Sequence, residues 1–322
     1  MKVSICIPVY NSSKYLKTSL QSIFNIKIGD FDVEYIASNN FSSDNSLDIL
    51  NEFKILGLKI FDQKENINSS GNFNFLIEKS SGDYIFIMHS DDIYHPDILI
   101  EYMKEVGSNN YQFIFCNGNI INNTGEIIGT LITNSRKNLL ITKEFFLDQI
   151  IFKGRNLIVA PSVMIKKELI IKAGMWSHHY GPMHDVDLWL NIFDIQNGYL
   201  INKNLIKYRK HSEQESTYHY NHNINNDNFS PIFIFFSRAI ETNRINKYYE
   251  KKIKHDELLR IVKSYIINTS KYPFNKLNQS LIKIDKLNSI KYSLIKRILS
   301  MRFSYVLLNI AVRSFKFLII KK

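Results

Sequence analysis

Two adjacent carboxylates and a histidine follow a short apolar run in the stretch YIFIMHSDDIYHPD at residues 84–97. The run Tyr84–Met88 has the length and the aromatic and β-branched content of a strand, and it stops abruptly at His89. Ligands bind at the carboxyl ends of the strands in an open α/β sheet, so we expect Asp91 and Asp92 to face a ligand there. Hard oxygen ligands suit Mg²⁺ or Mn²⁺, and these ions in turn suit a diphosphate.

The alternative interpretation is that the two carboxylates only cap the helix that follows them. Pro96 stands where a helix can begin, and an apolar helical face comes after it, formed by Ile98, Leu99, Tyr102, Met103 and Val106. Carboxylates at a helix N-terminus accept backbone hydrogen bonds and complement the helix dipole. The remainder of the sequence favours the ligand-binding interpretation.

The first part of the chain alternates strand and helix patterns at short, regular spacing. Four predicted strands have this spacing, at residues 3–9, 33–37, 58–61 and 84–88. The helix after the second strand is expected to be capped by Ser43 or Asp44, and the helix after the third strand is expected to follow a polar loop at residues 66–74. This βαβ pattern predicts a parallel sheet with helices on both faces.

The second part of the chain is expected to add mixed strands to this sheet. The predicted elements, in order, are a strand at 113–117, a hairpin at 120–128, a helix at 142–152 capped by its threonine, a strand at 159–165, a helix at 187–195, short strands at 199–201 and 205–208, and helices from about residue 230. The strand at 159–165 contains Pro161, which places it at a sheet edge or at a bulge.

Length and composition fit an ordinary globular protein. The 322 residues, of which 45% are hydrophobic and 22% charged, leave room for one large α/β domain with an extension, or for two domains. Cys6 and Cys116 fit neither a disulfide framework nor a zinc-binding spacing, which favours a reducing compartment. The N-terminus lacks the pattern of a secretory leader, and no run of 18 apolar residues is present.

The positive charge of the chain is concentrated near its C-terminus. The net charge is +11, and residues 286–322 contain nine basic and no acidic residues, which leaves the rest of the chain at +2. Apolar residues spaced three or four apart run through this segment, as in amphipathic helices. We expect the segment to bind an anionic membrane surface; the alternative is a helix packed on the rest of the chain with a solvated basic face. The nearly neutral body argues against a nucleic-acid partner.

Polar clusters recur at the ends of the predicted strands, and together they resemble a known family. The motifs are SICIPVYNSSKYL at 4–16, SNNFSSDNS at 38–46, GNFN at 71–74, GDYIFIMHSDDIYHPD at 82–97, HDVDLWL at 184–190 and YRKHSEQES at 208–216. In this order and spacing, they make the first two-thirds of the chain similar to a family 2 glycosyltransferase of the GT-A fold, of the type that makes bacterial surface polysaccharides.

The resemblance implies the α/β fold of nucleotide-diphospho-sugar transferases, a Rossmann-like mixed sheet with helices on both faces. The catalytic domain is expected at residues 1–218, with the nucleotide-sugar half at about 1–117 and the acceptor half at about 118–218. A helical, basic extension is expected at residues 219–322.

The resemblance also implies a nucleotide-sugar donor, expected to be a UDP-sugar, lying across the carboxyl edge of the sheet. The base is expected against a wall formed by Pro8, Val9 and Tyr10, with polar groups for the uracil and ribose supplied by the loop at Asn39. Further donor contacts are assigned to Asn11, Asn72, Ser90, Asp91 and Arg209.

Metal ligands and the catalytic base follow from the same resemblance. Asp91 and Asp92 are the expected ligands of a Mg²⁺ or Mn²⁺ ion that bridges the donor phosphates, and His211 is expected to complete the metal shell or to hold the diphosphate together with Arg209. An inverting transfer needs a carboxylate that takes the proton of the acceptor hydroxyl. Asp185 matches the acidic motif of the family and is the expected base, whereas Asp187 is expected at the helix N-terminus without a catalytic role.

Three residues depart from the family pattern. Asn39 stands where the family usually has Asp, and because an amide donates as well as accepts hydrogen bonds, the identity of the base is less defined. His89 replaces the Asp that often begins the metal motif. We expect its side chain to support the metal ligands without binding the metal, or to pack in the core. His184 stands where Glu is common. Trp176 and Trp189 are expected in the core, with Trp176 also a candidate to face the acceptor.

The leading hypothesis is therefore a metal-dependent hexosyl or N-acetylhexosaminyl transferase. It is expected to act in the cytoplasm, at the inner face of the cell membrane, on a glycan or a polyprenyl-linked acceptor in O-antigen, capsule or LPS synthesis. A nucleotidyltransferase would share a nucleotide-binding α/β sheet, but its glycine-rich phosphate loop is absent from the sequence. A third hypothesis is a non-catalytic binding protein that keeps the fold, suggested by Asn39 and His89. The sugar, acceptor, linkage and oligomeric state stay open.

Overall fold

The computed structural model describes residues 1–132, 137–212, 214 and 230–267. The chain divides into two compact units, Met1–Tyr218 and His219–Lys322. In the described part of the first unit the strands are β1 Lys2–Val9, β2 Asp32–Asn39, β3 Leu58–Asp62, β4 Tyr84–Ile87, β5 Ile93–Tyr94, β6 Phe113–Ile121, β7 Ile127–Thr130, β8 Leu139–Ile141, β9 Val163–Lys166 and β10 Gly198–Arg209. Its α-helices are α1 Ser13–Phe24, α2 Ser46–Glu52, α3 Asn68–Lys79, α4 Ile98–Asn109, α5 Lys143–Lys153, α6 Lys167–Lys172 and α7 His184–Phe193. Its 3₁₀ turns are Lys54–Leu56, Ala160–Ser162 and His178–Met183.

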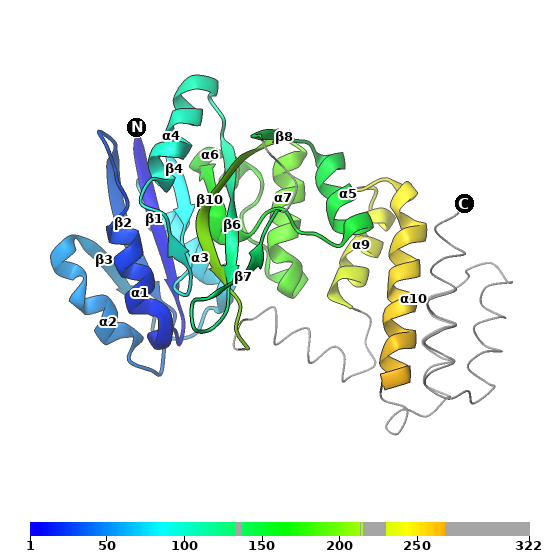
Figure 1. Ribbon diagram of the computed structural model, residues 1–322, viewed down its shortest axis with the longest axis horizontal. Coiled ribbons are helices and arrows are strands. Elements are labelled where there is room, and N and C mark those ends of the chain that lie inside the picture. The colour runs from blue at the N-terminus through cyan, green and yellow to red at the C-terminus, as the bar shows by residue number, and fades with distance from the viewer. Residues whose placement is uncertain (133–136, 213, 215–229, 268–322) are drawn as a thin grey trace, which may run out of the picture. The chain divides into compact units, whose positions relative to one another are not determined.

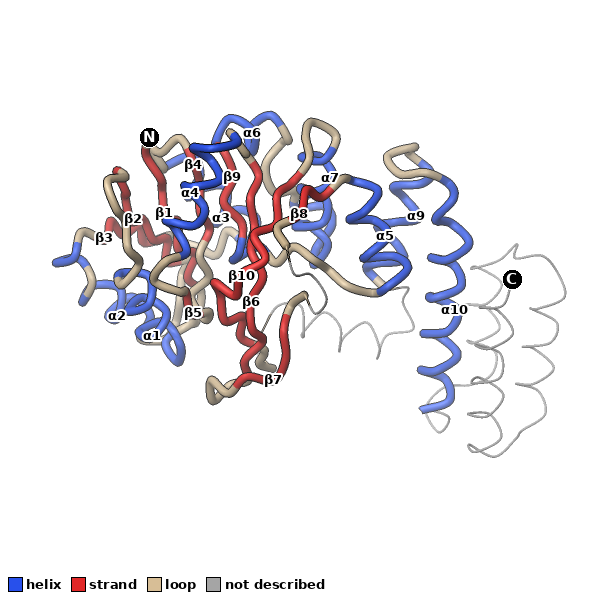
Figure 2. Tube along the Cα trace, turned by 45° about the horizontal axis from the view of Figure 1, so that its top comes forward, coloured by secondary structure: helices blue, strands red, loops and turns tan. Residues whose placement is uncertain are grey.

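The strands form one mixed sheet, which Figure 2 shows in red. The strand order is β3-β2-β1-β4-β9-β6-β10-β5, with β7 paired to β6 and β8 paired to β10. Strands β3, β2, β1 and β4 are parallel, β9 is antiparallel to both β4 and β6, and β10 is parallel to β6. The carboxyl ends of β1, β4, β6 and β10 therefore share one edge of the sheet, and the polar residues that follow them are brought together there.

Helices cover both faces of the sheet, as predicted (Figure 1). The odd-numbered residues of β1 from Val3 to Val9 belong to a core cluster with the apolar residues of α1 and α4. Side chains alternate across a strand, so Cys6 points to the opposite face, where its Sγ lies 4.0 Å from the carbonyl oxygen of Leu76 in α3. On that second face the ring of Phe113 in β6 stacks on Trp189 of α7 at 5.5 Å. The core is thus two apolar layers with the sheet between them.

One prediction about strand position is wrong. Pro161 lies in the 3₁₀ turn Ala160–Ser162, and β9 begins after it and runs inside the sheet between β4 and β6. Proline cannot donate to a sheet ladder, but it is tolerated in the turn that precedes a strand. An edge position is therefore not required.

Several helix boundaries also differ from the predictions. Helix α3 begins at Asn68, inside the predicted polar loop, and α7 begins at His184, before the predicted start at residue 187. Helix α2 begins at Ser46, and neither Ser43 nor Asp44 occupies its N-cap. The carboxylate of Asp44 instead accepts hydrogen bonds from the backbone N–H of Ser46 at 3.0 Å and of Ser13 at 2.9 Å, so it links the starts of α2 and α1.

Other local predictions are confirmed or extended. The hairpin near residue 124 is the β6–β7 pair, and the Thr142 side chain caps α5 by accepting the backbone N–H of Phe145 at 3.2 Å. The two short strands at 199–201 and 205–208 are one continuous strand, β10, whose register against β6 shifts around Asn204. Strands β5 and β8 were not predicted, since each has too few residues to produce a recognisable pattern.

The described part of the second unit contains α9 Pro231–Glu241, a 3₁₀ turn Lys247–Tyr249 and α10 Glu250–Ile267. Ser230 caps α9, and the buried carboxylate of Glu257 accepts hydrogen bonds from the backbone N–H and hydroxyl of Ser230 while pairing with Arg260. Among the helices that the structure describes, none has the length and apolarity needed to cross a bilayer. Residues 286–322, for which membrane binding is expected, lie outside the described residues.

Candidate active site

A cleft of about 800 Å³ opens at the carboxyl edge of the sheet. Its lining comes from the end of β1 and the residues that follow it, from the residues after β4, from the first turns of α3 and α7, and from the end of β10. Its lining residues are Pro8, Val9, Tyr10, Asn11, Ser12, Lys14, Tyr15, Asn40, Asn66, Asn68, Ser69, Asn72, Phe73, His89, Ser90, Asp91, Pro182, His184, Asp185, Tyr208, His211 and Gln214.

The loop after β1 is held in place by the loop after β2. Asn11 has a left-handed backbone conformation with φ of 45°, which Asn tolerates better than most residues. Its side-chain Oδ1 accepts the backbone N–H of Ser43 at 2.8 Å, and its own backbone N–H donates to Ser42 Oγ at 3.0 Å. Tyr10, half of whose surface is exposed, is thereby presented at the rim of the cleft as a flat aromatic wall.

A cluster of three potential metal ligands lies at the end of β4. His89, Asp91 and Asp92 each offer one ligand atom, and these atoms lie within 4.8 Å of one another. Asp92 is fully buried, and its Oδ1 accepts the backbone N–H of Arg209 at 2.7 Å. Its Oδ2 is buried and has no hydrogen-bond partner among the described residues. A carboxylate oxygen without a partner beside a second carboxylate and an imidazole fits a site for a divalent cation.

The two carboxylates differ in their ionisation. Burial and the neighbouring charge of Asp91 raise the pKa of Asp92 well above its usual value, despite the hydrogen bond from the backbone of Arg209. Burial alone would raise the pKa of Asp91 as well, but the hydrogen bond from His211 and the charges of His89 and His211 outweigh it and lower the pKa. Asp91 is thus the more acidic of the two carboxylates in the absence of a cation.

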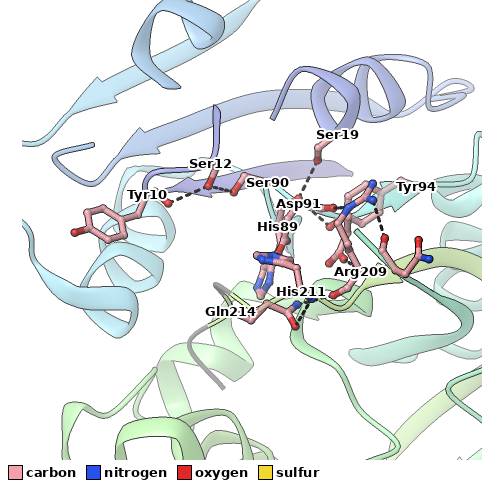
Figure 3. Close-up of polar contacts among 12 residues, drawn as sticks. Tyr10, Ser12, Ser19, His89, Ser90, Asp91, Tyr94, Arg209, His211 and Gln214 are labelled. Carbon is pink, nitrogen blue, oxygen red and sulfur yellow. Dashed lines mark hydrogen bonds and ion pairs between the residues drawn. The ribbon is translucent and has the colours of Figure 1, made fainter. Parts of the chain in front are cut away.

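Residues from three segments fix Asp91 and its neighbours (Figure 3). His211, after β10, lies with its Nε2 at 3.0 Å from Asp91 Oδ2. The hydroxyl of Ser90 donates a hydrogen bond to Ser12 Oγ at 2.7 Å, which connects the end of β4 to the start of α1. His211 therefore contacts the proposed ligand Asp91 but is not part of the three-residue ligand cluster of His89, Asp91 and Asp92.

Arg209 lies behind the cleft, outside its lining. Its guanidinium donates through Nε to the carbonyl oxygen of Asp91 at 2.8 Å and through a terminal nitrogen to the carbonyl of Asn122 at 3.0 Å. It also lies over the ring of Tyr15, 4.5 Å from the centroid. These contacts hold the backbone at Asp91 and Asn122 and fix the position of the guanidinium.

Asp185 reaches the cleft from the first turn of α7. The indole Nε1 of Trp176 donates to its Oδ1 at 2.8 Å, and Nε2 of His184 lies 3.5 Å from the same oxygen. The side chain keeps 28% of its surface exposed. Asp187, two residues further along the helix, is 4% exposed and does not line the cleft.

Most of the predicted site residues converge on this cleft, but three do not line it. Those that do are Pro8, Val9, Tyr10, Asn11, Asn72, Ser90, Asp91, Asp185 and His211. Asn39, Asp92 and Arg209 lie behind the lining. Asn39 donates through Nδ2 to Asp62 Oδ1 at 2.8 Å, and its neighbour Asn40 lines the cleft instead.

Sequence reasoning missed several lining residues, among them Asn40 and Tyr208. Burial and the charges of Asp92, Asp91 and Asp185 raise the pKa of Tyr208 well above its usual value. Its hydroxyl therefore stays protonated and can donate a hydrogen bond to a ligand. The sequence signal for Tyr208 is its position in the motif YRKHSEQES, in which Arg209 and His211 are the residues predicted to contact the donor or the metal.

The mixed sheet, with helices on both faces and a cleft at its carboxyl edge, has the architecture of the GT-A fold. The family model described as "Glycosyl transferase family 2" matches residues 4–172, which is more than half of the chain, and the chain belongs to this family.

Curated relatives share parts of the chain. An uncharacterised glycosyltransferase of Rickettsia typhi is 26% identical over 217 residues, 66% of this chain and 65% of that protein. The poly(ribitol-phosphate) beta-glucosyltransferase of Bacillus spizizenii is 35% identical over 105 residues, 32% of this chain and 17% of that protein. Abequosyltransferase RfbV of Salmonella typhimurium is 32% identical over 102 residues, 31% of each chain. The chain thus spans less than two-thirds of the length of these relatives.

Solved structures share the fold. The S. aureus protein TarS in complex with UDP-GlcNAc superposes with a TM-score of 0.63 at 14% identity, over 88% of this chain and 80% of that chain. Mannosyltransferase PcManGT from Pyrobaculum calidifontis, in complex with GDP-Man and Mn²⁺, gives a TM-score of 0.55 at 12% identity, over 95% and 82% of the two chains.

Proposed function

We propose that the protein is an inverting glycosyltransferase that moves a sugar from a nucleotide-diphosphate donor to a hydroxyl group of a glycan or a lipid-linked oligosaccharide. The observation that carries the proposal is that Asp91, Asp185 and Tyr10 all line one cleft. Asp91 belongs to the cluster of potential metal ligands after β4, whereas Asp185 lies in the first turn of α7 and accepts a hydrogen bond from an uncharged indole. These are the two distinct carboxylate roles that a single displacement at an anomeric carbon needs.

In this proposal Asp185 acts as the general base. It takes the proton of the acceptor hydroxyl while the hydroxyl oxygen forms its bond to the anomeric carbon, and the bond between that carbon and the nucleoside diphosphate breaks. The diphosphate leaves with the electron pair of the broken bond. No enzyme nucleophile takes part, so the configuration of the anomeric carbon inverts in one step.

Asp91 and Asp92, with His89 beside them, would hold the cation at the donor diphosphate. A Mg²⁺ or Mn²⁺ ion at this position would stabilise the negative charge that the departing diphosphate gains. His211, which was proposed as a ligand, contacts Asp91 and would orient its carboxylate. Tyr208 adds a protonated hydroxyl at the same end of the cleft.

A UDP-sugar is the donor that we favour. The fold is shared with a protein that was crystallised with UDP-GlcNAc, although a second structure with this fold holds GDP-Man. Asn72 lines the cleft, and its Oδ1 has no hydrogen-bond partner among the described residues, so it can accept a hydrogen bond from a base. The names of two relatives, a poly(ribitol-phosphate) beta-glucosyltransferase and an abequosyltransferase, support an acceptor among bacterial surface polysaccharides. Such a reaction would take place at the cytoplasmic face of the membrane, where the basic segment at 286–322 would bind.

A binding and hydrolysis panel tests this proposal. UDP-, GDP-, dTDP- and CDP-sugars are offered to the full chain with Mn²⁺, with Mg²⁺ and with a chelator, and both binding and slow sugar release are measured. We expect one nucleotide class to bind and to be hydrolysed slowly, and we expect both signals to fall with the chelator. Binding without any hydrolysis or transfer would support the non-catalytic alternative, and no binding of any nucleotide would contradict both.

A further inference from the structure

The indole of Trp176 lies directly behind the proposed base. Its Nε1 donates to Oδ1 of Asp185 at 2.8 Å, and Trp176 is itself only 3% exposed. No described residue donates a hydrogen bond to Oδ2 of Asp185, although the side chain lines the cleft. One carboxylate oxygen is therefore fixed from the protein side, and the other is left for the acceptor hydroxyl.

Trp176 is held so that its N–H cannot turn away from Asp185. The side-chain amide of Asn74 in α3 accepts the backbone N–H of Trp176 at 3.0 Å and donates to its backbone carbonyl at 2.9 Å. The indole ring packs edge-on against Phe73 at 5.3 Å and against Trp189 at 5.9 Å. Two hydrogen bonds thus fix the backbone, and two aromatic contacts fix the ring.

The uncharged N–H of the Trp176 indole is a suitable hydrogen-bond donor to a carboxylate that acts as a base. An indole N–H donates one hydrogen bond and carries no charge. An Arg or Lys in the same place would stabilise the ionised carboxylate by charge and make it a weaker base. The neighbouring His184 is tied to α3 as well, because its Nδ1 lies 2.7 Å from Ser70 Oγ. Both groups that contact Oδ1 of Asp185 are therefore anchored on the same helix.

We propose that Trp176 is a positioning residue, which orients the carboxylate of Asp185 for proton transfer without neutralising it. The proposal rests on the proposed role of Asp185 as the base. Helix α3 also carries Asn72 on the lining of the cleft, so one helix connects the donor end of the site to the base. A misplacement of about 1 Å at a reacting group can lower a rate by about 10²-fold, which sets the upper size of the expected effect.

The substitution Trp176→Phe tests the proposal, because it keeps an aromatic ring and removes the N–H. We expect kcat for transfer to fall by about 10- to 100-fold while the KM and the affinity for the donor stay unchanged. Trp189→Phe is the matched control, since Trp189 is fully buried in the same aromatic cluster and its Nε1 has no hydrogen-bond partner among the described residues. The control is expected to lose folding stability but to keep kcat, because phenylalanine retains an aromatic ring against the Trp176 indole.

A double variant separates this inference from the proposed function. Adding Trp176→Phe to Asp185→Asn should cost no further activity if the indole acts through the carboxylate. An inactive Asp185→Asn protein together with a fully active Trp176→Phe protein would overturn the role of Trp176 alone. An active Asp185→Asn protein would overturn the base itself. Equal losses of kcat in Trp176→Phe and Trp189→Phe would show a packing effect and overturn the positioning role.

Fluorescence gives a readout that does not depend on turnover. The chain has two tryptophans, so Trp189→Phe leaves Trp176 as the sole tryptophan emitter. In that background Asp185→Asn removes the charge beside the indole N–H, and the emission of Trp176 should change. Unchanged emission would contradict the contact on which the proposal depends.

Discussion

Asp91 and Asp92 are neighbours in sequence but occupy different environments. Asp91 lines the cleft and is hydrogen-bonded to His211. Asp92 is fully buried, its pKa is raised, and its Oδ2 has no hydrogen-bond partner in the part of the chain that the structure describes. A divalent cation is a large local charge, and its binding requires deprotonated carboxylates. Cation binding and ionisation of Asp92 should therefore be coupled.

The substitution Asp92→Asn tests this coupling, because Asn keeps the acceptor for the Arg209 backbone but carries no charge. Mn²⁺ or Mg²⁺ should stabilise the wild-type protein by roughly 2–3 kcal/mol at a hundredfold excess over its Kd, and should not stabilise the variant. The pKa of Asp92 in the folded protein lies above its unfolded value of about 3.9. Between these two pKa values the folded state binds more protons than the unfolded state, so the metal-free wild type loses stability as pH rises through this range.

The variant lacks this titration, so its metal-free stability relative to wild type should increase as pH rises from about 4. Thermal unfolding with and without each ion, between acid and neutral pH, measures both effects. A variant that still responds to the ions, or a wild type that responds to neither, would contradict the assignment of Asp92.

Individual site residues were predictable where a motif ends a strand. Asp91 and Asp185 reach the cleft because residues after parallel strands and at helix starts meet at one edge of the sheet. Asn39 and Asn40 were not distinguishable, because a shift of one residue reverses the side to which a side chain points. The hydrogen bond between Trp176 and Asp185 arises from tertiary packing, and no local sequence pattern predicts it.

Strand β10 is the element on which the cation end of the site depends. It carries Tyr208 and Arg209 to the carboxyl edge and pairs with β6 through an irregular register. Gly118 of β6 pairs with Ile206 of β10, and a Cβ there would meet the carbonyl oxygen of Ile206 at 2.5 Å. A backbone atom cannot move aside as a flexible side chain can, so this approach requires glycine.

The substitution Gly118→Ala should therefore destabilise the fold by about 1–3 kcal/mol, the usual cost of overpacking. Gly107→Ala is the matched control, because Gly107 lies in α4 and a Cβ there meets nothing within 4 Å. It should stabilise the protein by about 0.4–1 kcal/mol. Urea unfolding of both variants measures the difference, and an equal effect of the two alanines would refute the close approach of β6 and β10.

The alternating elements of the first half were predictable from hydrophobic periodicity, whereas the order of the later strands was not. Residues 202–204, with the sequence NKN, interrupt the apolar pattern of β10 and mimic a turn. The position of β9 inside the sheet depends on pairing with β4 and β6, strands distant in sequence. Such pairing depends on the tertiary fold and leaves little trace in the local sequence.

At the scale of the whole molecule, the chain separates a nearly neutral body from a basic end. The cleft is built within the first unit, while nine basic and no acidic residues occupy positions 286–322. Those residues lie outside the described part of the structure, so the membrane prediction rests on the sequence alone.

Truncation after residue 285 tests the membrane prediction. The full chain should bind vesicles containing anionic lipid and release them as salt increases, because each basic residue contributes about 1 kcal/mol near such a surface. The truncated chain should lose this binding, and neither form should bind neutral vesicles strongly. Equal sedimentation of both forms with anionic vesicles would contradict membrane binding by residues 286–322.

The decisive measurement is sugar transfer by Asp185→Asn beside Asp187→Asn, with donor affinity measured for both proteins. Asn keeps the size of Asp185 and can still accept the hydrogen bond of the Trp176 indole through its amide oxygen, but it cannot take up the acceptor proton. Asp185→Asn should bind the nucleotide sugar normally and lose transfer by about 10²-fold or more. Asp187, which lies outside the cleft, should tolerate the same change with near-normal kcat in the folded protein. Near-normal transfer by Asp185→Asn, with transfer lost in Asp187→Asn, would contradict the proposed mechanism.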